Sequence, residues 1–219
     1  MNKKTKTIYW AGDLFNFKDL TGNVEMASLV EELSGGRYQV KLPQLSESNS
    51  LRTVREIRDG DLELLISCDV MVGNFDGSDL DSGTVVEFCF AKMLDMPVVL
   101  LRTDFRSTGD QGAGGDPWNL MCSGYPRTET LCFHGMSLFH EHFKKEGSPR
   151  EKLDAYRRDI AGKVIAALDQ ICRERSLFPP EDLEAHYRRI IHAAGGGLGE
   201  LFPPERLKKL IASKLEKME

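Results

Sequence analysis

Residues 68–91 constrain the fold of this chain more than any other stretch. They contain an apolar run, then an acidic turn, and then a second apolar segment. Val70–Phe75 predicts a buried strand and Asp76–Gly83 a turn. A helix is expected from about Thr84, with Glu87 in its first turn. Open α/β folds bind ligands at the carboxyl ends of their strands, so the stretch predicts a ligand site beside this turn.

Strands and helices alternate along most of the remaining chain. Further strands are expected at 5–10, 38–42, 97–101 and 131–133, and helices at 23–33, 51–67 and 152–175. We expect the 51–67 helix to break at Asp59–Gly60, so that Asp61 opens a second segment, and 43–50 to form a loop. The alternation predicts an α/β fold with a doubly wound, flavodoxin-like parallel sheet flanked by helices.

The end of the chain contains a short duplication. LFPPEDL begins at Leu177 and LFPPERL at Leu201, and a charged amphipathic helix is expected after each. We therefore divide the chain into a catalytic domain at 1–175 and a helical C-terminal extension at 176–219. The extension is interpreted as a packing or subunit-contact appendage, with a separate binding module as the alternative.

Composition argues against two classes of partner. The 219 residues carry a formal net charge of −5 in mixed charges, without the basic stripe that nucleic-acid binding needs. No apolar run reaches the roughly 18 residues of a membrane span. We therefore expect a cytoplasmic protein that binds neither nucleic acid nor membrane.

The cysteines and histidines give no recognisable metal site. The five cysteines are scattered without a CxxC pair, and we interpret them as reduced, small core residues. His140 and His142 stand at alternate positions without a third ligand at a typical spacing, so surface placement is expected for both. No bound metal is predicted.

Three carboxylates are candidates for catalysis. A nucleophilic carboxylate together with a carboxyl that protonates the leaving group performs retaining glycosyl transfer, and Asp61, Asp81 and Glu87 offer that set. The positive end of the helix dipole is expected to favour an ionised Glu87. The alternatives for Asp81 and its acidic neighbours are helix capping, a solvated turn or a divalent metal site. Glu87 differs from them because its neighbours are apolar, and a buried carboxylate needs a reason.

Several blocks of sequence together resemble one enzyme family. They are IYWAGDLF at 8–15, DLELLISCDVMVGNFDG at 61–77, DSGTVVEFCFA at 81–91, MPVVLLRTDFR at 96–106 and WNLM at 118–121. In this order they resemble the nucleoside 2-deoxyribosyltransferase family over about the first 125 residues, which is more specific than any single motif. The extension lies outside the resemblance.

The resemblance implies roles for particular residues. Glu87 falls on the family's nucleophile, Asp81 and Asp61 on the pair that binds and protonates the base, and Tyr9 on a residue that orients the nucleophile. Asn119 falls on an asparagine that reaches the site of a neighbouring subunit. The resemblance therefore implies a homodimer or higher homo-oligomer with shared active sites.

Further substrate-binding candidates come from the predicted loops. Gly12 follows the first strand, Phe15 lies in the loop above it and is a candidate to stack on a base, and Gly83 lies in the acidic turn. Gln44, in the 43–50 loop, is a candidate to meet the ligand. The family often has proline after the first glycine, whereas Asp13 stands here.

The function implied by the resemblance is transfer of 2-deoxyribose from a deoxynucleoside to another free nucleobase through a covalent glutamyl-deoxyribosyl intermediate. It needs no cofactor and would serve nucleoside salvage. The alternative is an N-glycosidic hydrolase of deoxynucleosides or deoxynucleoside 5'-monophosphates, in which water replaces the second base. A third hypothesis is a sensor that binds a nucleoside-like ligand without turnover.

Overall fold

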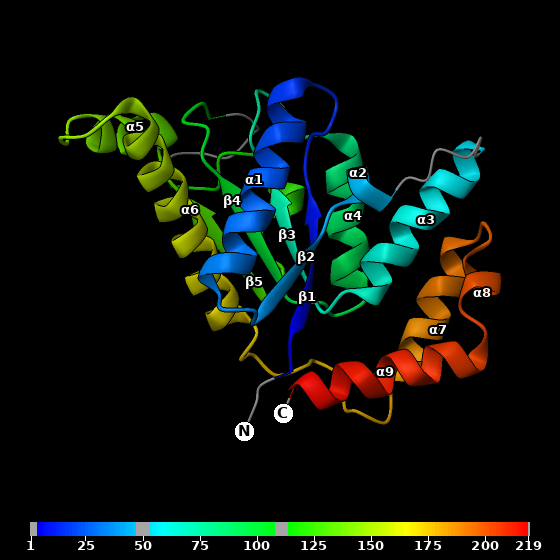
Figure 1. The fold of residues 1–219 in the computed structure, drawn as a ribbon. Helices are drawn as coiled ribbons and strands as arrows, with labels where there is room; N and C mark the ends of the chain where they lie inside the picture. Colours follow the sequence, from blue (N-terminus) through cyan, green and yellow to red (C-terminus); the bar gives the residue numbers. More distant parts are fainter. Residues whose placement is uncertain (1–3, 47–52, 108–113, 219) are drawn as a thin grey trace.

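A computed structural model describes residues 4–46, 53–107 and 114–218. In this part of the chain a five-stranded sheet has the order β2-β1-β3-β4-β5, and every neighbouring pair is parallel (Figure 1). The strands are β1 (Lys6–Ala11), β2 (Tyr38–Lys41), β3 (Val70–Asn74), β4 (Val98–Arg102) and β5 (Thr128–Cys132). This is the predicted doubly wound order, and the expected fold class is confirmed.

Helices cover both faces of the sheet (Figure 1). They are α1 (Phe17–Leu33), α2 (Pro43–Ser46), α3 (Val54–Ser67), α4 (Ser82–Met93), α5 (Gly135–Phe143), α6 (Pro149–Ile171), α7 (Leu183–Ala194), α8 (Leu198–Leu201) and α9 (Pro204–Met218), with a 3₁₀ turn at Leu120–Cys122. Helices α1 and α6 pack on one face, whereas α3, α4 and α7 contribute to the core on the other.

Successive side chains of β1 point to opposite faces of the sheet, as the pleat requires. Ile8 and Trp10 lie in the core beneath α1 and α6. Tyr9 and Ala11 lie in the core beneath α3 and α4. The alternation therefore places Tyr9 on the face that carries Glu87.

The predicted break in the 51–67 helix is wrong. Helix α3 runs through Asp59 and Gly60 after a capping box formed by Thr53 and Glu56. An Asp side chain can interrupt a helix by bonding to nearby backbone groups. The Asp59 carboxylate instead accepts a hydrogen bond of 2.6 Å from the distant backbone N of Gly197. Asp61 consequently lies inside a continuous helix and does not open one.

Other differences concern ends of elements. Helix α1 begins at Phe17, six residues before the predicted start at 23, because Asn16 caps it through Lys18 N and Asp19 N. Residues 43–46 of the predicted loop form α2, and 47–50 lie outside the described residues. Strand β5 begins at Thr128 instead of 131, and α6 begins at Pro149 instead of 152.

Two side-chain expectations are also wrong. His142 is buried rather than on the surface, because its Nε2 pairs with Asp159 Oδ2 at 3.0 Å, whereas His140 is exposed as expected. Cys132 is exposed rather than a core residue, because β5 is an edge strand, whereas Cys68 and Cys122 are buried.

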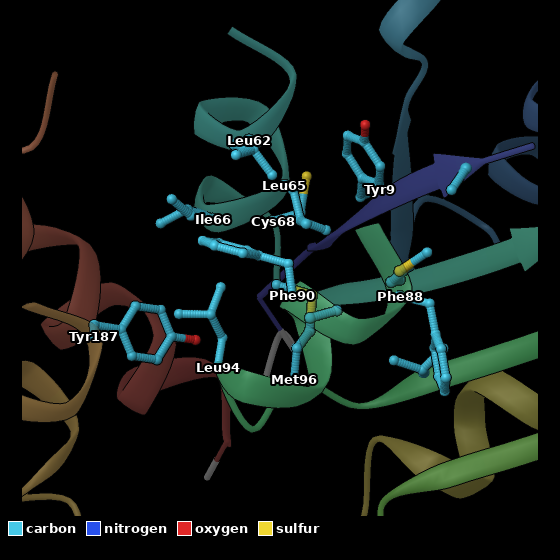
Figure 2. Close-up of a cluster of buried hydrophobic side chains, with 14 of the residues drawn as sticks. Tyr9, Leu62, Leu65, Ile66, Cys68, Phe88, Phe90, Leu94, Met96 and Tyr187 are labelled. Carbon is cyan, nitrogen blue, oxygen red and sulfur yellow. The ribbon is translucent and has the colours of Figure 1, made fainter. Parts of the chain in front are cut away.

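The extension packs against the α3 and α4 side of the molecule. Tyr187 and Ile191 of α7 are buried in the same cluster as Leu65 and Leu94, and Figure 2 shows the Tyr187 ring facing Leu94. The second LFPPE copy places Pro204 at the start of α9, whereas the first forms a turn before α7. The domain division at residue 175 stays a prediction.

None of the helices in the described part of the chain combines the length and the apolar composition that a membrane span requires.

Candidate active site

The acidic turn ends at a helix cap. Helix α4 begins at Ser82, and Asp81 caps it: its Oδ2 accepts hydrogen bonds from Thr84 N at 2.7 Å and from Thr84 Oγ1 at 2.9 Å. The capping alternative for Asp81 is thus present in the structure. Because α4 begins two residues earlier than predicted, Glu87 lies in its second turn and not in its first.

Tyr9 and Glu87 meet between β1 and α4. The Tyr9 hydroxyl donates a hydrogen bond of 2.5 Å to Glu87 Oε1. The Tyr9 side chain is completely buried, and Figure 2 shows its ring at the edge of the apolar cluster with the hydroxyl pointing away from Leu94 and Met96. Burial beside the Glu87 carboxylate raises the pKa of Tyr9 well above its ordinary value, so Tyr9 stays a hydrogen-bond donor.

The surroundings of Glu87 disfavour the ionised form of its carboxyl group. Burial raises the pKa of Glu87 to about 7, the hydrogen bond from Tyr9 opposes this rise, and the negative charges of Asp61 and Asp81 add to it. The net balance runs against the ionised form that we expected for Glu87, because desolvation is the largest of these influences. A carboxylate with a strongly shifted pKa inside a cavity is a candidate functional group.

Glu87 lines a cavity of about 680 Å³, which lies within the size range of about 300–1,000 Å³ for small-molecule sites. One wall is the face of α4 formed by Ser82, Gly83, Val86, Glu87, Phe90 and Met93. The facing wall is α3, with Val54, Ile57, Arg58, Asp61 and Leu62. The third wall is α7, with Ile190, Ala193 and Ala194.

Asp76, in the same acidic turn, has a different position. Its Oδ1 accepts hydrogen bonds from Thr103 N at 2.5 Å and Asp104 N at 2.7 Å, and its Oδ2 accepts one from Thr103 Oγ1 at 2.8 Å. The buried Arg102 donates to the carbonyls of Phe75 and Gly77 in the same region. These contacts join the loops that follow β3 and β4, so Asp76 stabilises the conformation of the turn.

The glycines and Phe15 lie at the carboxyl ends of β1 and β3. Gly83 lines the cavity. Gly12 packs against Asn74, where a Cβ would lie 3.0 Å from the Cβ of Asn74, so no larger residue fits without movement. The Phe15 side chain is 75% exposed in the loop after β1. Phe15 and Gly12 do not line the cavity, and their substrate-binding roles stay predictions.

The two predicted amide side chains also lie outside the cavity. Gln44 donates to Leu20 O at 3.0 Å and accepts from Asn23 Nδ2 at 3.2 Å, so its amide joins α2 to α1. Asn119 is exposed and caps the 3₁₀ turn by accepting a hydrogen bond from Met121 N at 2.9 Å. Their roles likewise stay predictions.

Sequence reasoning missed most of the cavity lining. Gly83, Val86, Glu87 and Phe90 follow helical spacing, so the face of α4 that accompanies Glu87 is readable from its sequence. The wall from α7 has no such signal, because it depends on how the extension folds back. Among the described residues no group of three His, Cys, Asp or Glu side chains is arranged to hold a metal ion.

The solved structures that match this chain come from several organisms. A crystal structure of a conserved protein from Enterococcus faecalis V583 covers 63% of this chain and 97% of its own, with a TM-score of 0.51 and 24% identity. A 2-deoxyribosyltransferase from Bacillus psychrosaccharolyticus covers 54% of this chain and 81% of its own, with a TM-score of 0.42 and 24% identity. A 2-deoxyribosyltransferase from Leishmania mexicana covers 57% of this chain and 89% of its own, with a TM-score of 0.45 and 22% identity.

No curated protein matches the sequence. The family profile described as nucleoside 2-deoxyribosyltransferase matches residues 8–121, which is more than half of the chain and contains Tyr9, Asp61, Asp81 and Glu87. The chain therefore belongs to the nucleoside 2-deoxyribosyltransferase family.

Proposed function

We propose that this protein transfers 2-deoxyribose from a deoxynucleoside to a second nucleobase, with Glu87 as the nucleophile. The observation that carries the proposal is the hydrogen bond from the buried Tyr9 hydroxyl to Glu87 Oε1, at the edge of a cavity that also contains Asp61. Family membership supports the class of reaction.

In the first step, Glu87 Oε2 attacks C1' of the deoxyribose. The bond from C1' to the base nitrogen breaks, and its electron pair leaves with the base. Tyr9 occupies Oε1, so it fixes the carboxylate and leaves Oε2 to face the sugar. A carboxyl of Asp61 or Asp81 gives the departing base a proton, which neutralises it as it leaves.

In the second step, a nitrogen of the incoming base attacks C1' of the glutamyl ester. The ester bond breaks and restores the Glu87 carboxylate. The carboxylate that gave up its proton in the first step, that of Asp61 or Asp81, takes the proton of the new base. Two displacements at C1' give the product the configuration of the starting nucleoside. The negative charges that raise the pKa of Glu87 also stabilise the oxocarbenium-like transition state in each step.

Asn119 is proposed to contact the sugar bound by a neighbouring subunit. Its exposure, outside the cavity of its own chain, supports action on a second copy. The protein would then act as a homodimer or larger homo-oligomer with shared sites.

Hydrolysis of the glutamyl ester is the second candidate. Val54 is 85% and Val86 61% exposed, so the cavity that holds Glu87 is open to solvent along its apolar lining. Water that reaches the ester would release free deoxyribose, or its 5'-phosphate from a deoxynucleoside 5'-monophosphate.

The test is an exchange reaction followed by chromatography. The protein is mixed with a deoxynucleoside and a second free base, and the exchanged nucleoside is expected to accumulate. Glu87→Ala should abolish this, while Glu129→Gln, on edge strand β5, is the matched control with retained exchange. Free deoxyribose that forms at the same rate with and without the second base would favour hydrolysis, and exchange by the Glu87→Ala variant would refute the assignment.

A mass measurement tests the intermediate directly. Protein quenched with acid during turnover and digested should contain a Glu87 peptide heavier by one deoxyribosyl group. Exchange without this adduct would argue for direct transfer between the two bases.

A further inference from the structure

We propose that helix α7 of the C-terminal extension forms the specificity-determining wall of the substrate cavity and admits nucleobases that carry bulky apolar substituents. The inference rests on the proposed function and adds a substrate class to it. Its starting point is that Ile190, Ala193 and Ala194 line the cavity that contains Glu87. These residues lie outside the stretch at 8–121 that the family profile matches.

The C-terminal end of α7 is attached to α3 by specific contacts. Arg58, whose side chain lies in the cavity wall, donates from Nη2 to the carbonyl of Ala194 at 2.8 Å. The buried Asp59 accepts a hydrogen bond from Gly197 N at 2.6 Å, three residues further along. Because Arg58 and Asp59 precede Asp61 in the same helix, these contacts fix Ala194 relative to the proposed acid.

The N-terminal half of α7 is attached to α4 in the same way. His186 Nε2 pairs with the carbonyl of Met93, the last residue of α4, at 2.7 Å. Tyr187 and Ile191 are buried against the core that holds Phe90, and Figure 2 shows Tyr187 beside Leu94. Helix α7 is therefore held to both helices that carry the carboxylates, and its free face has a defined position in the cavity.

The chemistry of this wall points to the apolar part of a ligand. Ile190 is aliphatic, and the methyl groups of Ala193 and Ala194 leave room where larger side chains would fill the cavity. The cavity is also lined by Val86 and Phe90 of α4 and by Ile57 of α3, which are apolar as well. Planar bases with an apolar substituent bury more apolar surface in such a space than bare bases do, and this burial favours their binding.

The test fills the space from α7. Ala193→Phe and Ala194→Phe place a ring in the cavity, and Ala185→Phe, at an exposed position of α7 that does not line it, is the matched control. Exchange is measured with adenine and with benzyladenine as acceptor bases. We expect kcat/KM for benzyladenine to fall at least about tenfold more than for adenine in the cavity variants, and both values to stay within about twofold in the control.

Binding separates this inference from the proposed function. The deoxynucleoside of benzyladenine is titrated calorimetrically into Glu87→Gln protein with and without Ala193→Phe. Binding that the second substitution weakens at least about tenfold supports the α7 wall even if exchange is never observed. Equal affinity with and without Ala193→Phe, equal losses for both bases, or no binding to the Glu87→Gln protein would overturn the inference.

Discussion

The Tyr9 hydroxyl donates a hydrogen bond of 2.5 Å to Glu87 Oε1, although one residue comes from the first strand and the other from a helix 78 residues later in the chain. The bond opposes the effect of burial on the Glu87 carboxylate, and burial is the larger of the two. This balance decides how much of Glu87 is ionised and available as a nucleophile.

The activity of the wild-type protein is expected to depend on the ionisation of Glu87. Because burial raises the pKa of Glu87 to about 7, kcat/KM should fall about tenfold per pH unit below that value. A pH profile of base exchange measures this acidic limb, which is the fall in kcat/KM towards low pH. An acidic limb with its midpoint near the ordinary pKa of glutamate would contradict the assignment.

Replacing the hydroxyl is expected to shift that limb. Tyr9→Phe removes a hydrogen bond that lowers the pKa of Glu87, so the acidic limb should move to higher pH. A hydrogen bond to a charged group contributes about 1.5–3 kcal/mol, so kcat should also fall about 10- to 100-fold. Tyr38→Phe is the control, because its hydroxyl donates to Asp169 at 2.9 Å and its ring lies in the core beneath the other face of the sheet. Similar shifts in both variants would argue against a positioning role for Tyr9.

Glu87 should also make the free energy of unfolding depend on pH. Its folded pKa of about 7 lies above the ordinary 4.5, so proton binding to the folded state stabilises it. This contribution is complete below the ordinary value and is lost as the pH rises through about 7. Glu87→Gln should therefore be more stable than wild type by about 1–3 kcal/mol at about pH 8, and the difference should shrink towards pH 5. Denaturant unfolding at the two pH values measures this, and a pH-independent difference would contradict the expectation.

Gly196 should be intolerant of a side chain because of its place beside α3. Its φ is +66°, and a Cβ there would lie 2.7 Å from Arg58 Nη1 and against the Asp59 carboxylate. Gly196→Ala should cost about 1–2 kcal/mol for the backbone conformation and about 1–3 kcal/mol more for the clash. Gly35→Ala, with a φ of +62° and no atom near its Cβ, should show the backbone cost alone. Equal losses of unfolding free energy would show that the contact with Asp59 is unimportant.

Sharing of sites between subunits can be tested by complementation. If Asn119 acts on a neighbouring copy, Glu87→Ala and Asn119→Ala proteins should each be inactive or impaired, and mixed oligomers should contain an intact site. Subunits mixed after mild denaturation and renaturation should regain about a quarter of the activity, as random pairing into dimers gives sites with both residues. No recovery in verified mixed oligomers would place Asn119 in the site of its own chain or outside catalysis.

The fold was largely readable from the sequence, and the reasons are local. The apolar run of β4 is typical of a strand covered on both faces, and the alternation of strands with helices along the chain predicted a parallel sheet. The cap at Asp81 and the apolar neighbours of Glu87 likewise lie within a few residues of one another. Prediction was wrong at Asp59–Gly60, where residues typical of a turn continue a helix because the partner of Asp59 is Gly197, 138 residues away.

The sequence by itself determined the order of strands and helices, the acidic turn and the set of residues that places the chain in its family. Only the tertiary structure decided that Tyr9 contacts Glu87, that burial raises the pKa of that carboxylate, and that α7 forms the third wall of its cavity. The physical reason is the distance along the chain over which each property is set. Helix and strand patterns are set by neighbours along the chain, whereas desolvation and cavity shape depend on which distant segments pack together.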